Sequence, residues 1–140
     1  MEITISENFQ VSADSIWNLL RDFGGLLKWN SGSIESVTVD GEGLGAVRTI
    51  GLPGGAILQE KLEAFDDSGR SFSYSFTGKL LLPFENYLAT MTVIPTEEES
   101  CKVRWESTFD PGPLSEAQAK ETIEGVYRSG LSDLRKAAEG

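Results

Sequence analysis

The segment GAVRTIGLPGGAILQEKL, residues 45–62, predicts two β-strands joined by a Gly/Pro turn. Folding this hairpin about Gly54 places Ile50 opposite Leu58 and Arg48 opposite Glu60. Residues two apart on a strand share one face of the sheet, so this face is apolar and carries one Arg–Glu couple. Buried charges must be paired, and an apolar face with a single charged pair is typical of a ligand cavity rather than of a plain core.

Further strands are predicted on both sides of the hairpin, because apolar and polar residues alternate there. The candidate strands lie at residues 3–11, 34–39, 71–76, 87–94 and 101–109. Several short strands in succession indicate a mostly antiparallel sheet. On the second strand of the hairpin, Glu60 shares parity with Leu58, Leu62 and Ala64, so we expect all four to face inward.

Helical spacing replaces this alternation in the remaining segments. Ser12 is a predicted N-cap, and the helix after it ends at Gly24. Residues 26–29 form a second short helix or turn. Near the C-terminus, Ser115 and Gln118 fit a capping box. One apolar stripe of a long helix follows, formed by Ile123, Val126, Tyr127, Leu131, Leu134 and Ala138.

These elements predict a single α+β domain over residues 1–140. A curved antiparallel sheet of about seven strands would wrap around the long C-terminal helix, with two short helices after the first strand. In this arrangement, a sheet and a helix that are each apolar on one side bury their apolar sides against each other.

The composition excludes several functions. The chain has 140 residues and a formal net charge of −10, which opposes binding to nucleic acid or to an anionic membrane surface. Histidine is absent and Cys101 is the only cysteine, so Ser–His and Cys–His nucleophiles and an internal disulfide are excluded. We expect a cytoplasmic protein without membrane insertion, metal or cofactor, which is a monomer or a weak homodimer.

The order of elements resembles the helix-grip superfamily of START domains, birch-pollen allergens and polyketide cyclase/dehydrase-like proteins (SRPBCC). The resemblance covers essentially the whole chain. The motifs that carry it are residues 11–17, 45–48, 60–67, 86–87 and 127–131. Within that superfamily, Gly51–Gly55 is similar to the gate loop of plant abscisic-acid receptors. The resemblance implies that Glu60, Tyr87, Ile123, Tyr127 and Leu131 face a ligand.

This sequence differs from those receptors at positions that bear on recognition of the hormone. In those receptors a lysine pairs with the carboxylate of the hormone, and that lysine aligns near Ser33 of this chain. Leu80–Glu85 stands where those receptors have their latch, and it lacks the His-Arg pair of the latch. A second acidic residue in the pocket of those receptors aligns with either Glu106 or Trp105 of this chain. The alternation of inward and outward residues along the strand favours Trp105. The resemblance therefore implies a bacterial-type member with a ligand other than abscisic acid.

We predict a cavity that binds a small, largely hydrophobic molecule, such as a lipid, an aromatic compound or a polyketide-like compound. The predicted ligand-binding residues are Trp29, Arg48, Leu52, Pro53, Glu60, Tyr74, Phe76, Tyr87, Met91, Trp105, Ile123, Tyr127 and Leu131. Glu60 is either a ligand anchor or half of a structural ion pair, and Tyr74 is either a ligand contact or a core aromatic. Leu52–Gly55 is either a mobile gate or a plain hairpin turn.

The sequence also leaves two other functions open. One is a polyketide cyclase/dehydratase-like enzyme, or a lyase, that uses Glu60 as acid or base and Tyr87 as proton donor. The other is a ligand-gated protein-interaction module, in which closure of the gate presents a surface to a partner. The fold alone does not decide between binding and catalysis.

Overall fold

The computed structural model describes residues 1–78 and 83–140. The strands are β1 Glu2–Phe9, β2 Ser36–Asp40, β3 Val47–Gly51, β4 Ile57–Asp66, β5 Ser71–Thr77, β6 Glu85–Glu97 and β7 Ser100–Asp110. The helices are α1 Ala13–Leu20, α2 Leu27–Asn30 and α3 Glu116–Glu139. In the segment Leu80–Glu85, which we predicted to replace the latch, residues 80–82 lie outside the described residues.

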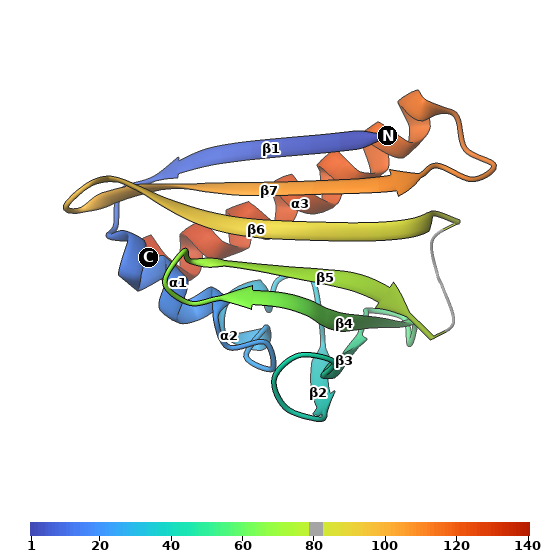
Figure 1. The fold of residues 1–140 in the computed structure, drawn as a ribbon, viewed down its shortest axis with the longest axis horizontal. Coiled ribbons are helices and arrows are strands. Elements are labelled where there is room, and N and C mark those ends of the chain that lie inside the picture. The colour runs from blue at the N-terminus through green and yellow to red at the C-terminus, as the bar shows by residue number, and fades with distance from the viewer. Residues whose placement is uncertain (79–82) are drawn as a thin grey trace.

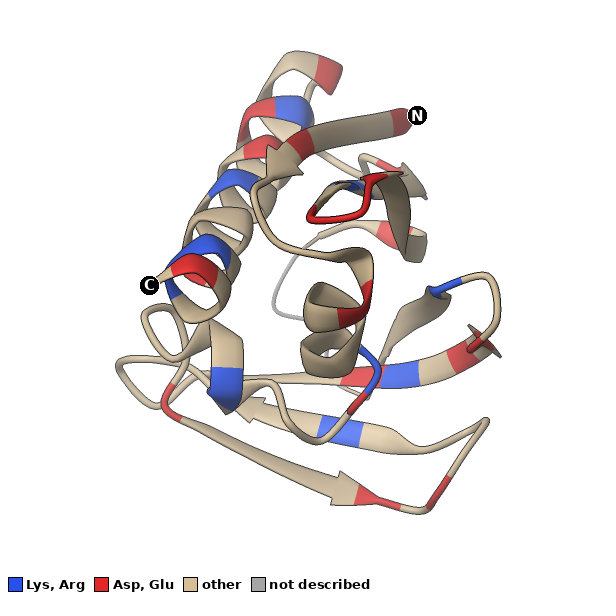
Figure 2. Cartoon of the chain, turned by 90° about the vertical axis from the view of Figure 1, so that its left-hand side faces the viewer, with Lys and Arg blue, Asp and Glu red and all other residues tan. Residues whose placement is uncertain are grey.

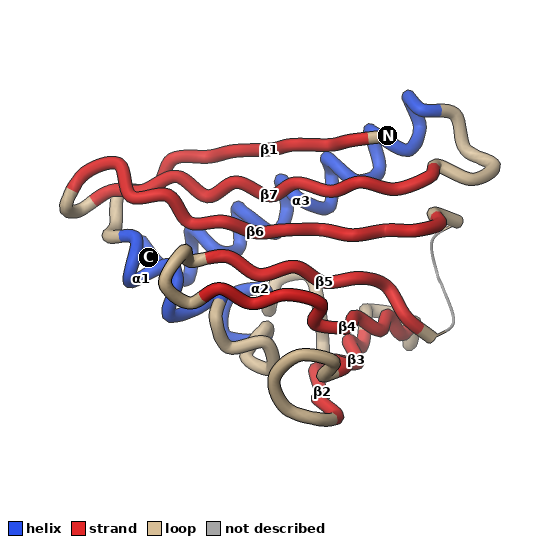
Figure 3. Tube along the Cα trace, viewed as in Figure 1, coloured by secondary structure: helices blue, strands red, loops and turns tan. Residues whose placement is uncertain are grey.

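The strands form one seven-stranded sheet in the order β1-β7-β6-β5-β4-β3-β2, and every neighbouring pair is antiparallel. Helix α3 runs along one face of this sheet beneath β1, β7 and β6 (Figures 1 and 3). Helices α1 and α2 lie on that same side, between β1 and β2 in the chain. The predicted α+β helix-grip architecture is confirmed.

Both predicted helix N-caps are confirmed. The Ser15 backbone N–H donates to Ser12 Oγ at 3.2 Å, which caps α1. At α3, Ser115 and Gln118 form the complete capping box, each side chain accepting from the other's backbone N–H. Because these bonds satisfy N–H groups that the first helical turn leaves unpaired, the sequence determines where each helix begins.

Four of the six residues of the predicted stripe on α3 are buried, and Ala138, near the end of the helix, is half-buried. Ile123, Tyr127, Leu131 and Leu134 are almost fully enclosed, whereas Val126 is 51% exposed. Helical spacing is too coarse to separate the centre of a stripe from its edge, and Val126 lies at the edge. Acidic and basic residues are mixed along the length of α3 (Figure 2).

The hairpin pairs as predicted, with Arg48 opposite Glu60 and Ile50 opposite Leu58. The expectation that Ala64 faces inward is wrong. Strand β4 carries a β-bulge between Leu62 and Ala64, so Leu62 pairs with Tyr74 and Ala64 with Ser73. An extra residue reverses the faces of the strand beyond it, and Ala64 is exposed.

No helix in residues 1–78 or 83–140 combines the length and the apolar character that crossing a membrane requires. Within those same residues, no three acidic or cysteine side chains are grouped so that they could hold a metal ion. The side chains that face the interior are instead mostly apolar and aromatic, and they do not fill it completely.

Candidate functional site

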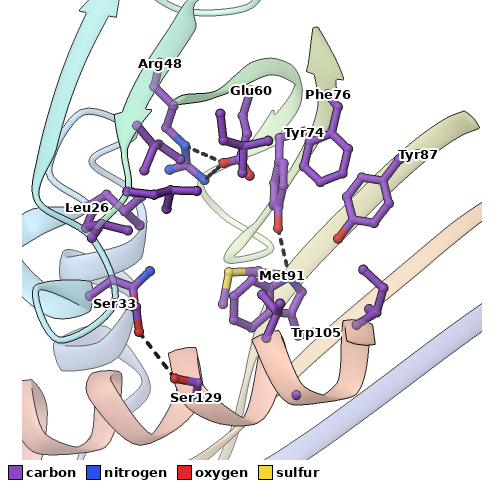
Figure 4. A pocket seen from close by; sticks show the side chains of 18 of the residues that line it. Leu26, Ser33, Arg48, Glu60, Tyr74, Phe76, Tyr87, Met91, Trp105 and Ser129 are labelled. Atoms are coloured by element: carbon purple, nitrogen blue, oxygen red, sulfur yellow. Dashed lines mark hydrogen bonds and ion pairs between the residues drawn. The ribbon is translucent and has the colours of Figure 1, made fainter. Parts of the chain in front are cut away.

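A cavity of about 550 Å³ lies between the concave face of the sheet, α2 and α3. Its walls are mostly apolar and aromatic. They are formed by Leu26, Trp29, Asn30, Ser33, Ile34, Arg48, Ile50, Leu52, Leu58, Glu60, Tyr74, Phe76, Tyr87, Met91, Trp105, Thr122, Ile123, Gly125, Val126 and Ser129. Figure 4 shows the pair Arg48–Glu60 and the hydroxyl groups of Tyr74 and Tyr87 facing this space.

Arg48 and Glu60 form a buried ion pair across strands β3 and β4, with 4% and 6% of their surfaces exposed. Arg48 Nε donates to Glu60 Oε1 at 2.8 Å, and Nη2 lies 2.6 Å from the same oxygen. The third nitrogen, Nη1, donates to the carbonyl of Phe23 at 3.1 Å. Each guanidinium nitrogen therefore already has a protein partner.

The guanidinium group is also covered by aromatic rings. Its central carbon lies 4.1 Å from the ring centre of Phe23 and 5.3 Å from that of Tyr74, within the range of cation–π attraction. In contrast, no described residue donates a hydrogen bond to Glu60 Oε2. The free polar group that this pair offers to the cavity is therefore an acceptor.

Two pairs of aromatic side chains are hydrogen-bonded beside the cavity. Trp105 Nε1 donates to the hydroxyl of Tyr74 at 3.1 Å, which leaves the Tyr74 proton without a partner among the described residues. The hydroxyl groups of Tyr87 and Tyr127 are hydrogen-bonded to each other. Phe76 stacks on Tyr87 with ring centres 4.0 Å apart, and Trp105 stacks on Tyr127 at 4.3 Å.

Burial keeps these phenols protonated. It raises the pKa of Tyr74 well above its ordinary value, and the nearby Glu60 carboxylate adds to this rise. Burial likewise raises the pKa of Tyr87 well above 10.0, and raises that of Tyr127 from 10.0 to about 12. The desolvated phenolate is disfavoured in each case, so the three hydroxyl groups are neutral at physiological pH.

We expect the free energy of unfolding to fall as the pH rises from about 10 to about 12. The unfolded tyrosines lose their protons near their ordinary pKa of 10.0, whereas Tyr127 in the fold keeps its proton to about 12. The folded state thus binds more protons in this window, and Tyr127 alone contributes a loss of about 3 kcal/mol across it. Below about pH 10 this contribution is fully present.

Tyrosinate absorbance and circular dichroism, recorded together during an alkaline titration, measure this effect. Because the chain has three tyrosines and all are buried, absorbance and unfolding should change together. Tyrosinate that forms near pH 10 while the circular dichroism is still native would contradict the expectation.

Most of the predicted site residues line the cavity. They are Trp29, Arg48, Leu52, Glu60, Tyr74, Phe76, Tyr87, Met91, Trp105 and Ile123. Pro53, Tyr127 and Leu131 are not part of the wall. Pro53 is exposed in the β3–β4 turn, Tyr127 packs behind Trp105, and Leu131 is enclosed in the core. Contact of any of these residues with a ligand remains a prediction.

Several wall residues were missed by the sequence analysis. Asn30 and Ser33 lie at the end of α2 and just beyond it, and Thr122, Gly125 and Ser129 lie on α3. They are small or polar, so no apolar pattern marks them. The signal that was present is their spacing on α3, because Thr122, Gly125 and Ser129 follow at i, i+3 and i+7 beside the predicted stripe.

The curved sheet, the long helix and the cavity between them define a helix-grip domain. Residues 1–139 match the family described as polyketide cyclase / dehydrase and lipid transport, and the chain belongs to this family. A search of curated proteins found no significant match.

Solved structures agree with this assignment. The chain is 31% identical to an uncharacterized protein from Bacillus thuringiensis, with a TM-score of 0.92 over 100% of both chains. It is 32% identical to the protein XoxI from Bacillus cereus, with a TM-score of 0.89 over 98% of this chain and 94% of that one. Norcoclaurine synthase from Thalictrum flavum, solved with a transition-state analogue, is 20% identical with a TM-score of 0.76 over 99% and 93% of the chains. This last likeness shows the fold alone.

Proposed function

We propose that this domain reversibly binds a small, largely apolar molecule that carries one neutral hydrogen-bond donor, such as a hydroxyl group. The observation that carries the proposal is the position of Glu60. Its carboxylate is buried in an apolar cavity, Arg48 occupies Oε1, and Oε2 has no donor among the described residues. An acceptor that faces a largely apolar cavity without a protein donor favours a ligand that supplies one.

The size and the walls of the cavity support a small-molecule ligand. A volume of about 550 Å³ falls within the range of typical ligand pockets. Trp29, Met91, Trp105 and Ile123 supply apolar surface, and Phe76 adds a half-buried aromatic ring. Such walls favour flat or hydrophobic molecules, and the family description includes lipid transport.

The charges argue against an anionic or cationic ligand. A carboxylate on the ligand would need a free cation, and the guanidinium of Arg48 is the only basic group in the cavity wall as described and is already engaged. An ammonium group would add a net positive charge to a pair that Arg48 already neutralises, in a site of low dielectric constant. A neutral donor avoids both costs.

The same ion pair favours binding over acid–base catalysis. If Glu60 took up a proton during a reaction, Arg48 would become a buried charge without a counter-charge, which is strongly unfavourable. The buried phenols of Tyr74 and Tyr87 hold their protons firmly, as their raised pKa values indicate. We therefore propose a carrier or receptor-like role.

Binding of naphthol, its methyl ether and naphthoate tests this proposal by isothermal calorimetry and tryptophan fluorescence. Naphthol should bind at least about tenfold more tightly than the methyl ether, because only naphthol can donate to Glu60, and a hydrogen bond to a charged group is worth roughly 1.5–3 kcal/mol. Naphthoate should bind least. The Glu60→Gln variant should lose most of the preference for naphthol over the ether.

Glu63→Gln is the matched control, because Glu63 is on the same strand but is exposed and accepts from Ser75. This control should keep the wild-type preference. Equal affinity of wild-type protein for naphthol and its methyl ether would overturn the assignment of Glu60 as the anchor. Binding of none of the three probes would overturn the proposed function.

A further inference from the structure

The boundary between the cavity and solvent lies along one face of α3. Among the cavity-lining residues that the structure describes, the exposed ones are Thr122, Gly125, Val126 and Ser129, all on α3. On the opposite side, Leu58 and Phe76 of the sheet and Leu52 of the β3–β4 turn are only half-buried. The mouth of the cavity is therefore bordered by α3 on one side and by β3, β4 and β5 on the other.

Near Ser129 and Asp133, this face of α3 is hydrogen-bonded to the segment between α2 and β2. Ser33, in the segment between α2 and β2, donates to Asp133 Oδ2 at 2.8 Å. The hydroxyl groups of Ser33 and Ser129 lie 3.3 Å apart and form a hydrogen bond (Figure 4). These contacts hold the α2–β2 segment against α3 at Ser129, so the unfastened part of the mouth is at Gly125 and Val126, about one helical turn before it.

Gly125 has no packing reason to be a glycine. A Cβ atom built on it would have no atom outside the neighbouring residues within 4 Å, whereas a Cβ on Gly130, one and a half turns later, would meet Trp105 at 2.8 Å. Glycine inside a helix destabilises it relative to alanine, so Gly130 is explained by close packing and Gly125 is not. What distinguishes Gly125 is its place at the exposed edge of the cavity.

We propose that the ligand enters and leaves over Gly125, between α3 and the β3–β4 turn, and that the missing side chain there sets the width of the passage. This inference rests on the proposed binding function for its ligand, but the passage itself can be tested without one. Because a Cβ atom at Gly125 meets no neighbouring side chain, we expect a larger side chain there to leave the fold intact. It would stand in the mouth rather than in the core.

The Gly125→Leu variant tests the passage by stopped-flow fluorescence with naphthol. Association and dissociation rate constants should both fall, by about tenfold, while the equilibrium constant changes little, because the bound contacts remain. Gly125→Ala should slow both rates less and should raise the melting temperature, since alanine favours the helix. Glu121→Leu, which adds the same side chain at an exposed position of α3 outside the cavity wall, should leave the rates unchanged.

Quenching of tryptophan fluorescence by acrylamide separates the passage from the ligand. Trp29 and Trp105 are buried in the cavity wall, so the small neutral quencher should reach them more slowly in Gly125→Leu than in wild-type protein or Glu121→Leu. Slower quenching without any naphthol binding would support the passage and overturn the proposed function. Unchanged quenching, or unchanged naphthol rates, in Gly125→Leu would overturn the passage itself.

Discussion

Replacing Arg48 with methionine is expected to lower the free energy of unfolding by about 3–5 kcal/mol, because Glu60 would become a buried carboxylate without a counter-charge. Both side chains are more than nine-tenths enclosed, so water solvates the stranded charge poorly. The variant also loses the hydrogen bond from Arg48 to the Phe23 carbonyl, which holds the segment after α1 against the hairpin.

Denaturant unfolding of the wild-type protein and of three variants measures this effect. The double variant Arg48→Met/Glu60→Leu should recover most of the loss, because replacing a whole buried pair by apolar residues is often neutral. Arg70→Met removes an exposed ion pair with Asp14 and should cost less than about 1 kcal/mol. A loss in Arg48→Met no larger than that in Arg70→Met would show that the buried pair is not needed for stability.

Replacing Trp105 with alanine is expected to cost about 3–5 kcal/mol of unfolding free energy, the usual range for removing a large buried aromatic side chain. Trp105 is 5% exposed and stacks on Tyr127 with an interplanar angle of 12°. It also packs edge-on against Trp29 with ring centres 6.4 Å apart, and its indole N–H is the donor to Tyr74. The substitution therefore removes the link between α2, α3 and the sheet.

Thermal and denaturant unfolding measure the loss, and naphthol titration measures its consequence for the cavity. Trp105→Phe is the matched control, because it keeps an aromatic ring against Tyr127 while it removes the hydrogen bond to Tyr74 and reduces the size of the ring system. That variant should cost about 1 kcal/mol beyond the change in ring size. If Trp105→Ala costs no more than Trp105→Phe, the stacking does not hold the cavity wall together.

Short-range physics made much of the fold predictable. Alternation with a period of two located the strands, and hydrogen bonds within four residues located the starts of α1 and α3, at Ser12 and Ser115. The pairing of Arg48 with Glu60 followed from counting outward from Gly54, since a tight turn sets the register of the strands on either side. These features depend on neighbours in the chain.

Other features of the site depend on atoms that are distant in the sequence. Neither the bulge that turns Ala64 outward nor the exposure of Val126 is marked in the local pattern, because each depends on how a neighbouring element packs. Tyr127 shares the stripe of Ile123, yet the ring of Trp105 stacks on it and it is not part of the cavity wall.

The sequence by itself determined which side chains face inward, apart from Ala64 and Val126, and it placed one charged pair among them. Only the tertiary structure decided that these side chains leave a space of about 550 Å³, with the exposed Gly125 among its lining residues. The physical reason is that the hydrophobic periodicity of the sequence indicates which way a side chain points but not how far it lies from the opposite wall of the cavity. That distance is set by the curvature of the sheet against α3, which many weak contacts across the whole domain decide together.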